Sequence, residues 1–155
     1  MLLQCVSPGA VLAGENAGAC ARKVLQAVVH ASGASLGEVL ESIPDEKERT
    51  ELIQRFVQPV RFFQDESGYI YVYTLEGLVV GHGGMKSLEG KNLIDHRDAR
   101  GTYDVRMAIE TARKGGGFFE HYWQKPGKKG EFKKITYIEP IPGTEYFIGA
   151  GVYIP

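Results

Sequence analysis

Residues 68–82 read Gly-Tyr-Ile-Tyr-Val-Tyr-Thr-Leu-Glu-Gly-Leu-Val-Val-Gly-His, and the rest of the chain is organised around this stretch. Three tyrosines alternate with an isoleucine and a valine over residues 69–73. This period of two, in aromatic and β-branched residues, predicts a β-strand that uses both of its faces. Residues 74–77 end on a glycine where a tight turn would lie, so the apolar residues after them are predicted to return as the second strand of a hairpin. That strand ends at His82, among glycines.

The three tyrosines and His82 suggest a functional surface. Phenols on one strand face, with an imidazole at the open end of the hairpin, would form the polar and aromatic wall of a pocket. The alternative is an ordinary sheet core in which the tyrosine hydroxyls reach the rim. These residues alone leave both interpretations open.

Length and composition favour one ordinary globular domain. The chain has 155 residues, of which 43% are hydrophobic and 24% charged. The net charge of −1 creates no overall field that would attract nucleic acid or a membrane. Five lysines between residues 125 and 134 form only a local basic hairpin, so no nucleic-acid partner is predicted. No apolar run approaches the ~20 residues of a transmembrane helix.

The N-terminal residues are less informative. Cys5 and Cys20 lack the Cys-x-x-Cys spacing of a zinc ribbon or a haem attachment site, and both a disulfide and free thiols stay open. Residues 1–19 are rich in small residues and lack the basic start and long apolar run of a secretion signal. We expect residues 1–19 to form a tail or linker and residues 20–155 to form a single domain.

The remaining chain predicts helices first and a sheet afterwards. Apolar spacing and capping signals predict helices over residues 21–31, 35–43, 45–58 and 104–114, with a break near Gly33. Residues 83–103 show little periodicity, and a connection of this length is usually functional or wraps a ligand. Three further strands are predicted over residues 118–124, 132–138 and 145–153. This order predicts an α+β fold with a five-stranded antiparallel sheet, which a parallel βαβ sheet would contradict.

Several short motifs, in a fixed order, resemble a known family. After residues 68–73 and His82 come Leu-Glu-Gly-Lys-Asn-Leu at 88–93, Asp-Ala-Arg-Gly at 98–101, Gly-Gly-Gly-Phe at 115–118, Tyr-Trp-Gln-Lys-Pro at 122–126, Lys-Ile-Thr-Tyr at 134–137 and Ile-Gly-Ala-Gly-Val-Tyr at 148–153. With these motifs, the chain resembles the single Cache domains, which are extracytoplasmic sensor modules of bacterial chemoreceptors, histidine kinases and related receptors. The resemblance runs from about Arg61 to Tyr153.

The resemblance implies a PAS-like five-stranded antiparallel sheet behind a long N-terminal helix, with a small-molecule pocket on the sheet. It implies a periplasmic or extracellular domain, without catalytic activity or cofactor, that binds an organic acid, amine or amino acid. A small carboxylate is the leading expectation. No predicted membrane helix flanks the domain, so it would be either the sensor of a signal-transduction or chemotaxis receptor or a stand-alone exported version. His121 stands where the family usually has tyrosine, which could change the ligand class.

Strand alternation and the resemblance together predict the binding residues. Alternation puts Tyr71 with Tyr73, and His121 with Trp123, on common strand faces. A buried carboxylate needs a charge-assisted donor, which Lys125 or Lys134 would supply. Lys134 and Tyr137 lie on opposite faces of a regular strand, so only one of them can face the pocket unless a bulge intervenes. The predicted ligand-binding residues are Tyr71, Tyr73, His82, His121, Trp123, Lys125, Lys134 and Tyr137.

Other functions stay open. A small enzyme on the same fold would use His82 or His121 as a general base and Asp95 or Asp98 as the carboxylate that orients it. A docking module would bind no small molecule. Residues 95–98 lack the regular spacing of metal ligands, so no metal site is predicted. A homodimer through the N-terminal helix is a further open prospect.

Overall fold

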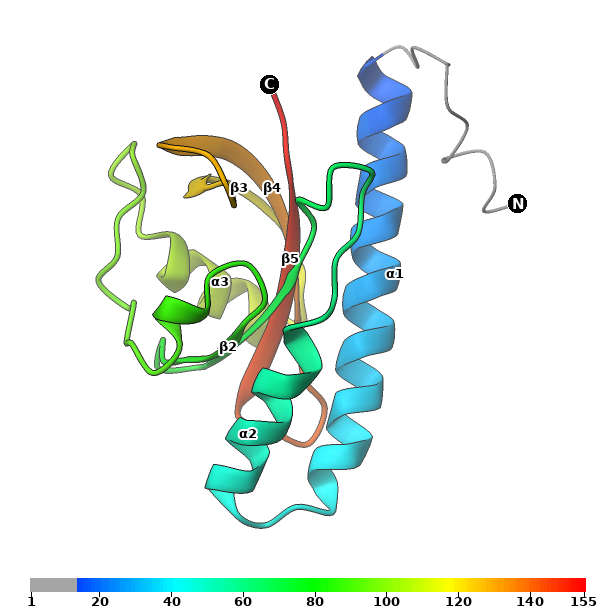
Figure 1. Ribbon diagram of the computed structural model, residues 1–155, viewed down its shortest axis with the longest axis vertical. Helices are drawn as coiled ribbons and strands as arrows, with labels where there is room; N and C mark the ends of the chain where they lie inside the picture. Colours follow the sequence, from blue (N-terminus) through cyan, green and yellow to red (C-terminus); the bar gives the residue numbers. More distant parts are fainter. Residues whose placement is uncertain (1–13) are drawn as a thin grey trace.

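The computed structural model describes residues 14–155, with side chains from residue 18 on. It contains a five-stranded antiparallel sheet with helices on both faces (Figure 1). The strand order is β2-β1-β5-β4-β3, so the last strand of the chain lies in the middle of the sheet. The predicted fold class is therefore confirmed. The elements are α1 (Gly14–Glu41), α2 (Glu46–Val57), β1 (Ile70–Thr74), β2 (Val79–His82), α3 (Asp104–Arg113), β3 (Gly117–Gln124), β4 (Glu131–Pro140) and β5 (Tyr146–Tyr153).

The predicted hairpin forms, and its alternation sorts side chains to two faces. Strand β1 pairs with β2 on one side and with β5 on the other. Ile70 and Val72 join the buried cluster under α1, whereas Tyr69, Tyr71 and Tyr73 join the cluster under α3. The strand is apolar on both faces because each face is covered by other elements.

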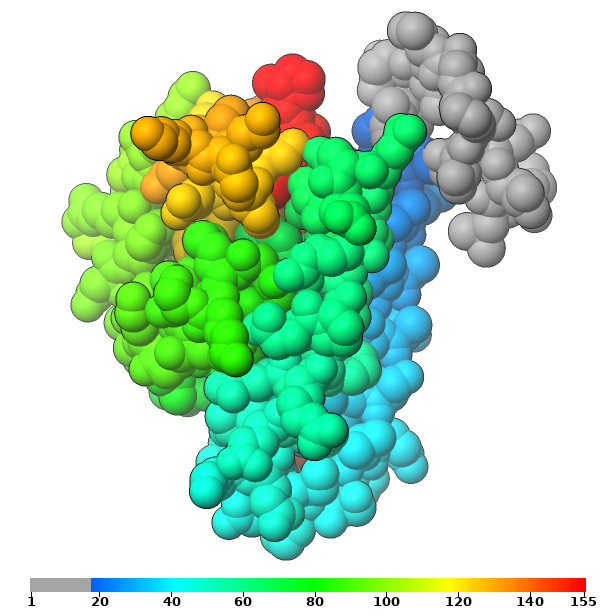
Figure 2. Space-filling model, in the orientation of Figure 1, coloured from blue at the N-terminus to red at the C-terminus, as the bar shows by residue number. Residues whose placement is uncertain are grey.

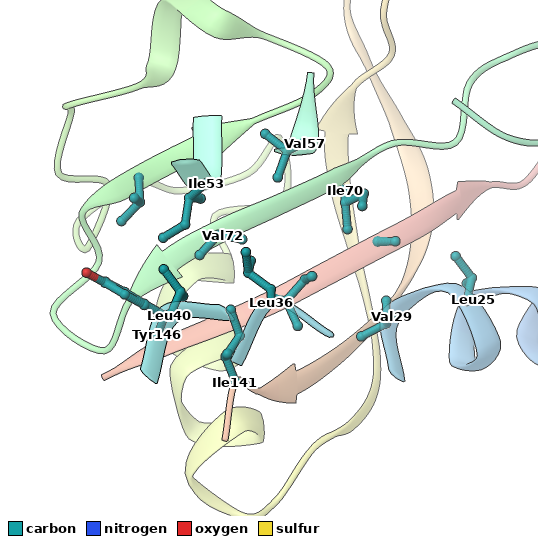
Figure 3. Close-up of a cluster of buried hydrophobic side chains, with 13 residues drawn as sticks. Leu25, Val29, Leu36, Leu40, Ile53, Val57, Ile70, Val72, Ile141 and Tyr146 are labelled. Atoms are coloured by element: carbon teal, nitrogen blue, oxygen red, sulfur yellow. The ribbon is translucent and has the colours of Figure 1, made fainter. Parts of the chain in front are cut away.

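One face of the sheet is covered by α1 and α2 (Figure 1). The buried residues of each helix recur every three or four positions, so each helix turns one stripe toward the sheet. Burying each of these large aliphatic side chains contributes roughly 1.5–3 kcal/mol. Figure 3 shows this cluster, in which the helical residues are Leu25, Val29, Leu36, Leu40, Ile53 and Val57.

The first two predicted helices are one helix in the structure. Helix α1 continues through Gly33 to Glu41, so the predicted break near Gly33 is wrong. The glycines mark close packing instead. A Cβ on Gly33 would lie 3.0 Å from Ile148 Cγ2, and a Cβ on Gly37 would lie 3.0 Å from the carbonyl oxygen of Pro142. A glycine inside a helix destabilises it by roughly 0.5–1 kcal/mol relative to alanine. In α1 the two glycines instead allow the helix to approach β5 and the turn that precedes β5.

The predicted boundary at residue 19 falls inside α1, because the helix begins at Gly14. Residues 14–19 are therefore helical, and the division of the chain into a tail and a domain stays a prediction. Cys5 lies outside the described residues, so its relation to Cys20 stays open.

The opposite face of the sheet is covered by α3 and by residues 83–103, which include a short 3-10 helix, Lys86–Leu88. The face of the sheet that carries Tyr69, Tyr71 and Tyr73 is called the tyrosine face below. Helix α3 packs Val105, Ala108 and Ile109 against it. In Figure 2 the atoms of the 83–103 segment, in green, adjoin those of the hairpin between β3 and β4, in yellow and orange. These segments enclose the tyrosine face and position the site described below.

Candidate ligand-binding site

A cavity lies between the tyrosine face of the sheet and α3, and we call it the inner cavity. In the structure it leaves only about 20 Å³ of space, roughly what one water molecule needs, so a bound acid would have to displace some of the lining side chains. All five strands and α3 contribute to its walls. The lining residues are Tyr71, Tyr73, His82, Asp104, Val105, Ala108, Phe119, His121, Trp123, Lys134 and Phe147.

Lys134 places a buried ammonium group in this cavity. The residue is 1% exposed, and its Nζ donates a hydrogen bond to the Tyr69 hydroxyl at 2.9 Å. The Nζ lies 4.2, 5.7 and 5.0 Å from the ring centres of Tyr69, Tyr71 and Tyr153. Aromatic faces attract a cation, but no carboxylate of the described residues lies within 4.0 Å of Nζ. Burial therefore lowers the pKa of Lys134 to about 7.

Two glycines of β5 make room for this arrangement. A Cβ on Gly151 would lie 2.4 Å from Lys134 Cε, and a Cβ on Gly149 would lie 2.7 Å from the Tyr71 hydroxyl. Any larger residue at these positions would displace the side chains that form the cavity wall.

His82 enters the cavity as a neutral side chain. Its Nδ1 accepts a hydrogen bond from the backbone N–H of Met85 at 2.8 Å, and burial lowers its pKa to about 3. At neutral pH the ring proton is therefore on Nε2, which can only donate. The ring lies between Tyr71 and Trp123, with centroid distances of 5.7 and 6.2 Å.

Asp104 connects two histidines at the start of α3, where a carboxylate is also favoured by the helix dipole. It is 2% exposed. Its Oδ1 accepts from the backbone N–H of Val105 at 3.0 Å and lies 2.8 Å from Nδ1 of His96. Its Oδ2 lies 3.2 Å from Nδ1 of His121, whose Nε2 lies 3.0 Å from Oγ1 of Thr136. Burial lowers the pKa of His121, so this ring is also predominantly neutral at pH 7.

Trp123 is 7% exposed and lies beside both His82 and His96. Its indole Nε1–H is buried and has no hydrogen-bond partner among the residues that the structure describes. Buried donors are normally paired, so this N–H is available to an acceptor on a ligand.

The structure places two of the eight predicted site residues outside the inner cavity. Lys125 lies outside the cavity, where its Nζ pairs with Asp65 at 2.9 Å and lies 5.5 Å from the ring centre of Tyr153. Tyr137 is on the α1 face of the sheet, where its hydroxyl donates to Glu139 at 2.9 Å. A regular β4 alternates its side chains, which excludes Tyr137 from the face that holds the lysine. The cavity contains the other six, namely Tyr71, Tyr73, His82, His121, Trp123 and Lys134.

Sequence reasoning missed three residues of the site. Asp104 was indistinguishable from any acidic residue that begins a helix. Thr136 shares a strand face with Lys134, and Tyr69 shares one with the other tyrosines of β1, so alternation could have included both.

The carboxylates considered for an enzyme lie elsewhere. Asp95 pairs with Arg106. Asp98 accepts backbone N–H bonds from Arg100, Thr102 and Tyr122, which fix a turn. Among the described residues, neither aspartate hydrogen-bonds to the two histidines considered as bases, although Asp98 is close enough to His121 to act on it electrostatically.

Over residues 14–155, no three or more His, Cys, Asp or Glu side chains are grouped so that they could hold a metal ion. Within the same part of the chain, no helix combines the length and the apolar character needed to cross a membrane.

Comparison with known sequences identifies relatives. A family model described as Cache domain matches residues 30–155. The sensor histidine kinase MctS of Rhizobium johnstonii is 29% identical over 89 residues, which are 57% of this chain and 19% of that kinase. The match thus spans about a fifth of the length of this curated relative.

Solved structures have the same fold. A methyl-accepting chemotaxis protein of Vibrio parahaemolyticus has a TM-score of 0.78 and is 26% identical, with 90% of this chain and 93% of that chain covered. The periplasmic sensor domain of a chemotaxis protein has a TM-score of 0.77 and is 26% identical, with 92% and 100% covered. A Cache chemosensory domain studied for carboxylic acid recognition has a TM-score of 0.78 over 93% and 100% of the two chains, but it is only 19% identical and shows the fold alone.

Proposed function

The chain belongs to the Cache domain family, and from that premise we propose that it is an extracytoplasmic sensor domain that binds a small monocarboxylate. Its relatives are sensor domains of chemotaxis receptors and a sensor histidine kinase. Membership of the family supports a role in signal transduction through ligand binding. The ligand class rests on the inner cavity.

The observation that carries the proposal is the unpaired ammonium of Lys134. A buried charge without a counter-ion is costly, and among the described side chains this one has only the Tyr69 hydroxyl as its hydrogen-bond partner. An ammonium has three N–H donors, so two remain for a ligand. A carboxylate bound here would supply the missing charge and accept both bonds. The neutral Nε2–H of His82 and the Nε1–H of Trp123 are further donors in the same wall.

The other lining residues favour a ligand with one charge. Lys134 is the one lysine or arginine among the residues that line the cavity. A second carboxylate would lie near Asp104 without a cation of its own. The ammonium of an amino acid would need Asp104, whose two oxygens already face His96, Val105 and His121. Apolar groups such as Phe119 suit a short alkyl chain instead.

The relatives of this chain support binding without chemistry, because they are sensor domains of receptors and a sensor histidine kinase. The Asp104 carboxylate beside His121 is already held by three partners, which are His96, Val105 and His121. We therefore propose that the domain is not an enzyme. Dimerisation through α1 stays a prediction.

A thermal-shift screen tests the ligand class. We expect acetate, propionate or lactate to raise the melting temperature, because a ligand at 100 times its dissociation constant adds about 2.7 kcal/mol of stability. Succinate, alanine and propylamine, each at the same concentration and ionic strength, should give no shift. Stabilisation by the dicarboxylate or by the amine instead would contradict the monocarboxylate proposal, and a shift with none of the panel would favour a docking module.

A further inference from the structure

Trp123 separates the inner cavity from a second hollow, which we call the outer chamber. The outer chamber has a volume of about 120 Å³ and is lined by Met85, Leu88, Leu93, His96, Trp123, Gln124 and Glu131. Trp123 is the one residue that lines both hollows. The outer chamber lies between the 83–103 segment and the hairpin of β3 and β4, the two segments that adjoin in Figure 2.

The two hollows differ in chemistry. The inner cavity contains the ammonium of Lys134, whereas no lysine or arginine of the described part of the chain lines the outer chamber. Met85, Leu88 and Leu93 give the outer chamber an apolar side, and all three are only half-buried. Glu131 also lines the outer chamber, and its negative charge disfavours a ligand carboxylate there. The outer chamber therefore suits an alkyl chain.

Trp123 is close to the charge that would anchor a ligand. Lys134 lies opposite His121 in the β3–β4 register, and Trp123 is two residues further along β3 on the same face. Such diagonal neighbours have Cα atoms roughly 7–8 Å apart. A carboxylate on Lys134 would need only a few carbon atoms before its chain reached the indole.

We propose that Trp123 is the specificity-determining residue that limits the length of the bound monocarboxylate, and that removing the indole joins the two hollows into one site for longer acids. The inference rests on the proposed function. The indole also offers its unpaired Nε1–H to the ligand, so the wall and the donor are two separable contributions of the same side chain. Each methylene that enters the outer chamber should strengthen binding about fourfold.

The test is calorimetric titration of the parent protein and of Trp123→Ala with the series acetate, propionate, butyrate, valerate and hexanoate. We expect the parent to prefer the short acids and to bind hexanoate at least tenfold more weakly than the best of them. We expect Trp123→Ala to bind hexanoate at least tenfold more tightly than the parent does. Trp123→Phe keeps an aromatic ring between the two hollows but removes the N–H donor. This variant should still prefer the short acids, and it should bind them more weakly than the parent does. Met85→Phe in the Trp123→Ala background refills the outer chamber and should remove the gain for hexanoate.

The outcomes separate the two proposals. If the parent binds short acids and Trp123→Ala keeps the same length preference, the role of the indole is overturned and the proposed function stands. If neither protein binds any acid of the series, both proposals fail. Circular dichroism melts check that each variant folds, and Trp123→Leu replaces Trp123→Ala if the alanine variant does not.

Discussion

Lys134→Met should abolish tight binding of short monocarboxylates while the domain stays folded. Methionine keeps much of the buried aliphatic volume but removes the ammonium that we propose as the partner of the ligand carboxylate. Truncating one partner of a buried, hydrogen-bonded charge pair costs about 2–5 kcal/mol, which is about thirtyfold or more in the dissociation constant. Calorimetric titration with propionate measures this loss directly.

Lys125→Met provides the matched control. Lys125 is a lysine of a neighbouring strand end, but it pairs with Asp65 outside the cavity. We expect this variant to bind propionate as the parent does. Equal losses in both variants would show that general positive charge, and not the group buried in the cavity, attracts the acid.

The stability of the ligand-free protein should rise with pH between about 7 and 10.5, because Lys134 has a pKa of about 7 when folded and an ordinary value of 10.5. In that range the unfolded chain binds more protons at this side chain than the folded protein does, so raising the pH favours folding by at most about 1.4 kcal/mol per pH unit. Lys134→Met removes this contribution. Urea unfolding of the two proteins at pH 7, 8 and 9 should therefore show the parent gaining stability relative to the variant at each step.

Carboxylate binding should show the opposite dependence. The ligand needs the charged ammonium, so affinity for propionate should fall above pH 7 by up to tenfold per pH unit. The neighbouring groups do not obscure this signal, because the pKa of His82 is lowered and that of Tyr153 is raised to about 12. An affinity independent of pH from 7 to 9, or one that rises, would contradict the role of Lys134.

The helices and strands that could be predicted from the sequence are those whose signal lies in a few neighbouring residues. Alternation in residues 69–73 predicted the first strand of the hairpin and its tyrosine face, and the charged start of α2 was confirmed by the bond from Glu48 N–H to Asp45 at 2.9 Å. The break near Gly33 was wrong because a glycine that ends a helix and a glycine that packs against a strand look the same in one chain. Only the position of Ile148 in space distinguishes them.

The site residues could be predicted only in part from the sequence. Alternation predicted which strand face each residue occupies, but it could not predict how deeply each side chain is buried. Lys125 and Lys134 are both lysines of the β3–β4 region, yet Lys134 is buried because Gly151, on a strand formed later in the chain, leaves space for its stem. Asp104 joins the site only because α3 folds back across the sheet.

The central claim is that the ammonium of Lys134 holds the carboxylate of a small acid inside the inner cavity. A crystal structure of the protein with propionate tests it most directly. The account predicts a propionate in the inner cavity with a carboxylate oxygen about 2.7–2.9 Å from Nζ of Lys134 and its alkyl chain against the ring of Trp123. A propionate bound elsewhere, or one whose carboxylate faces away from Lys134, would contradict it.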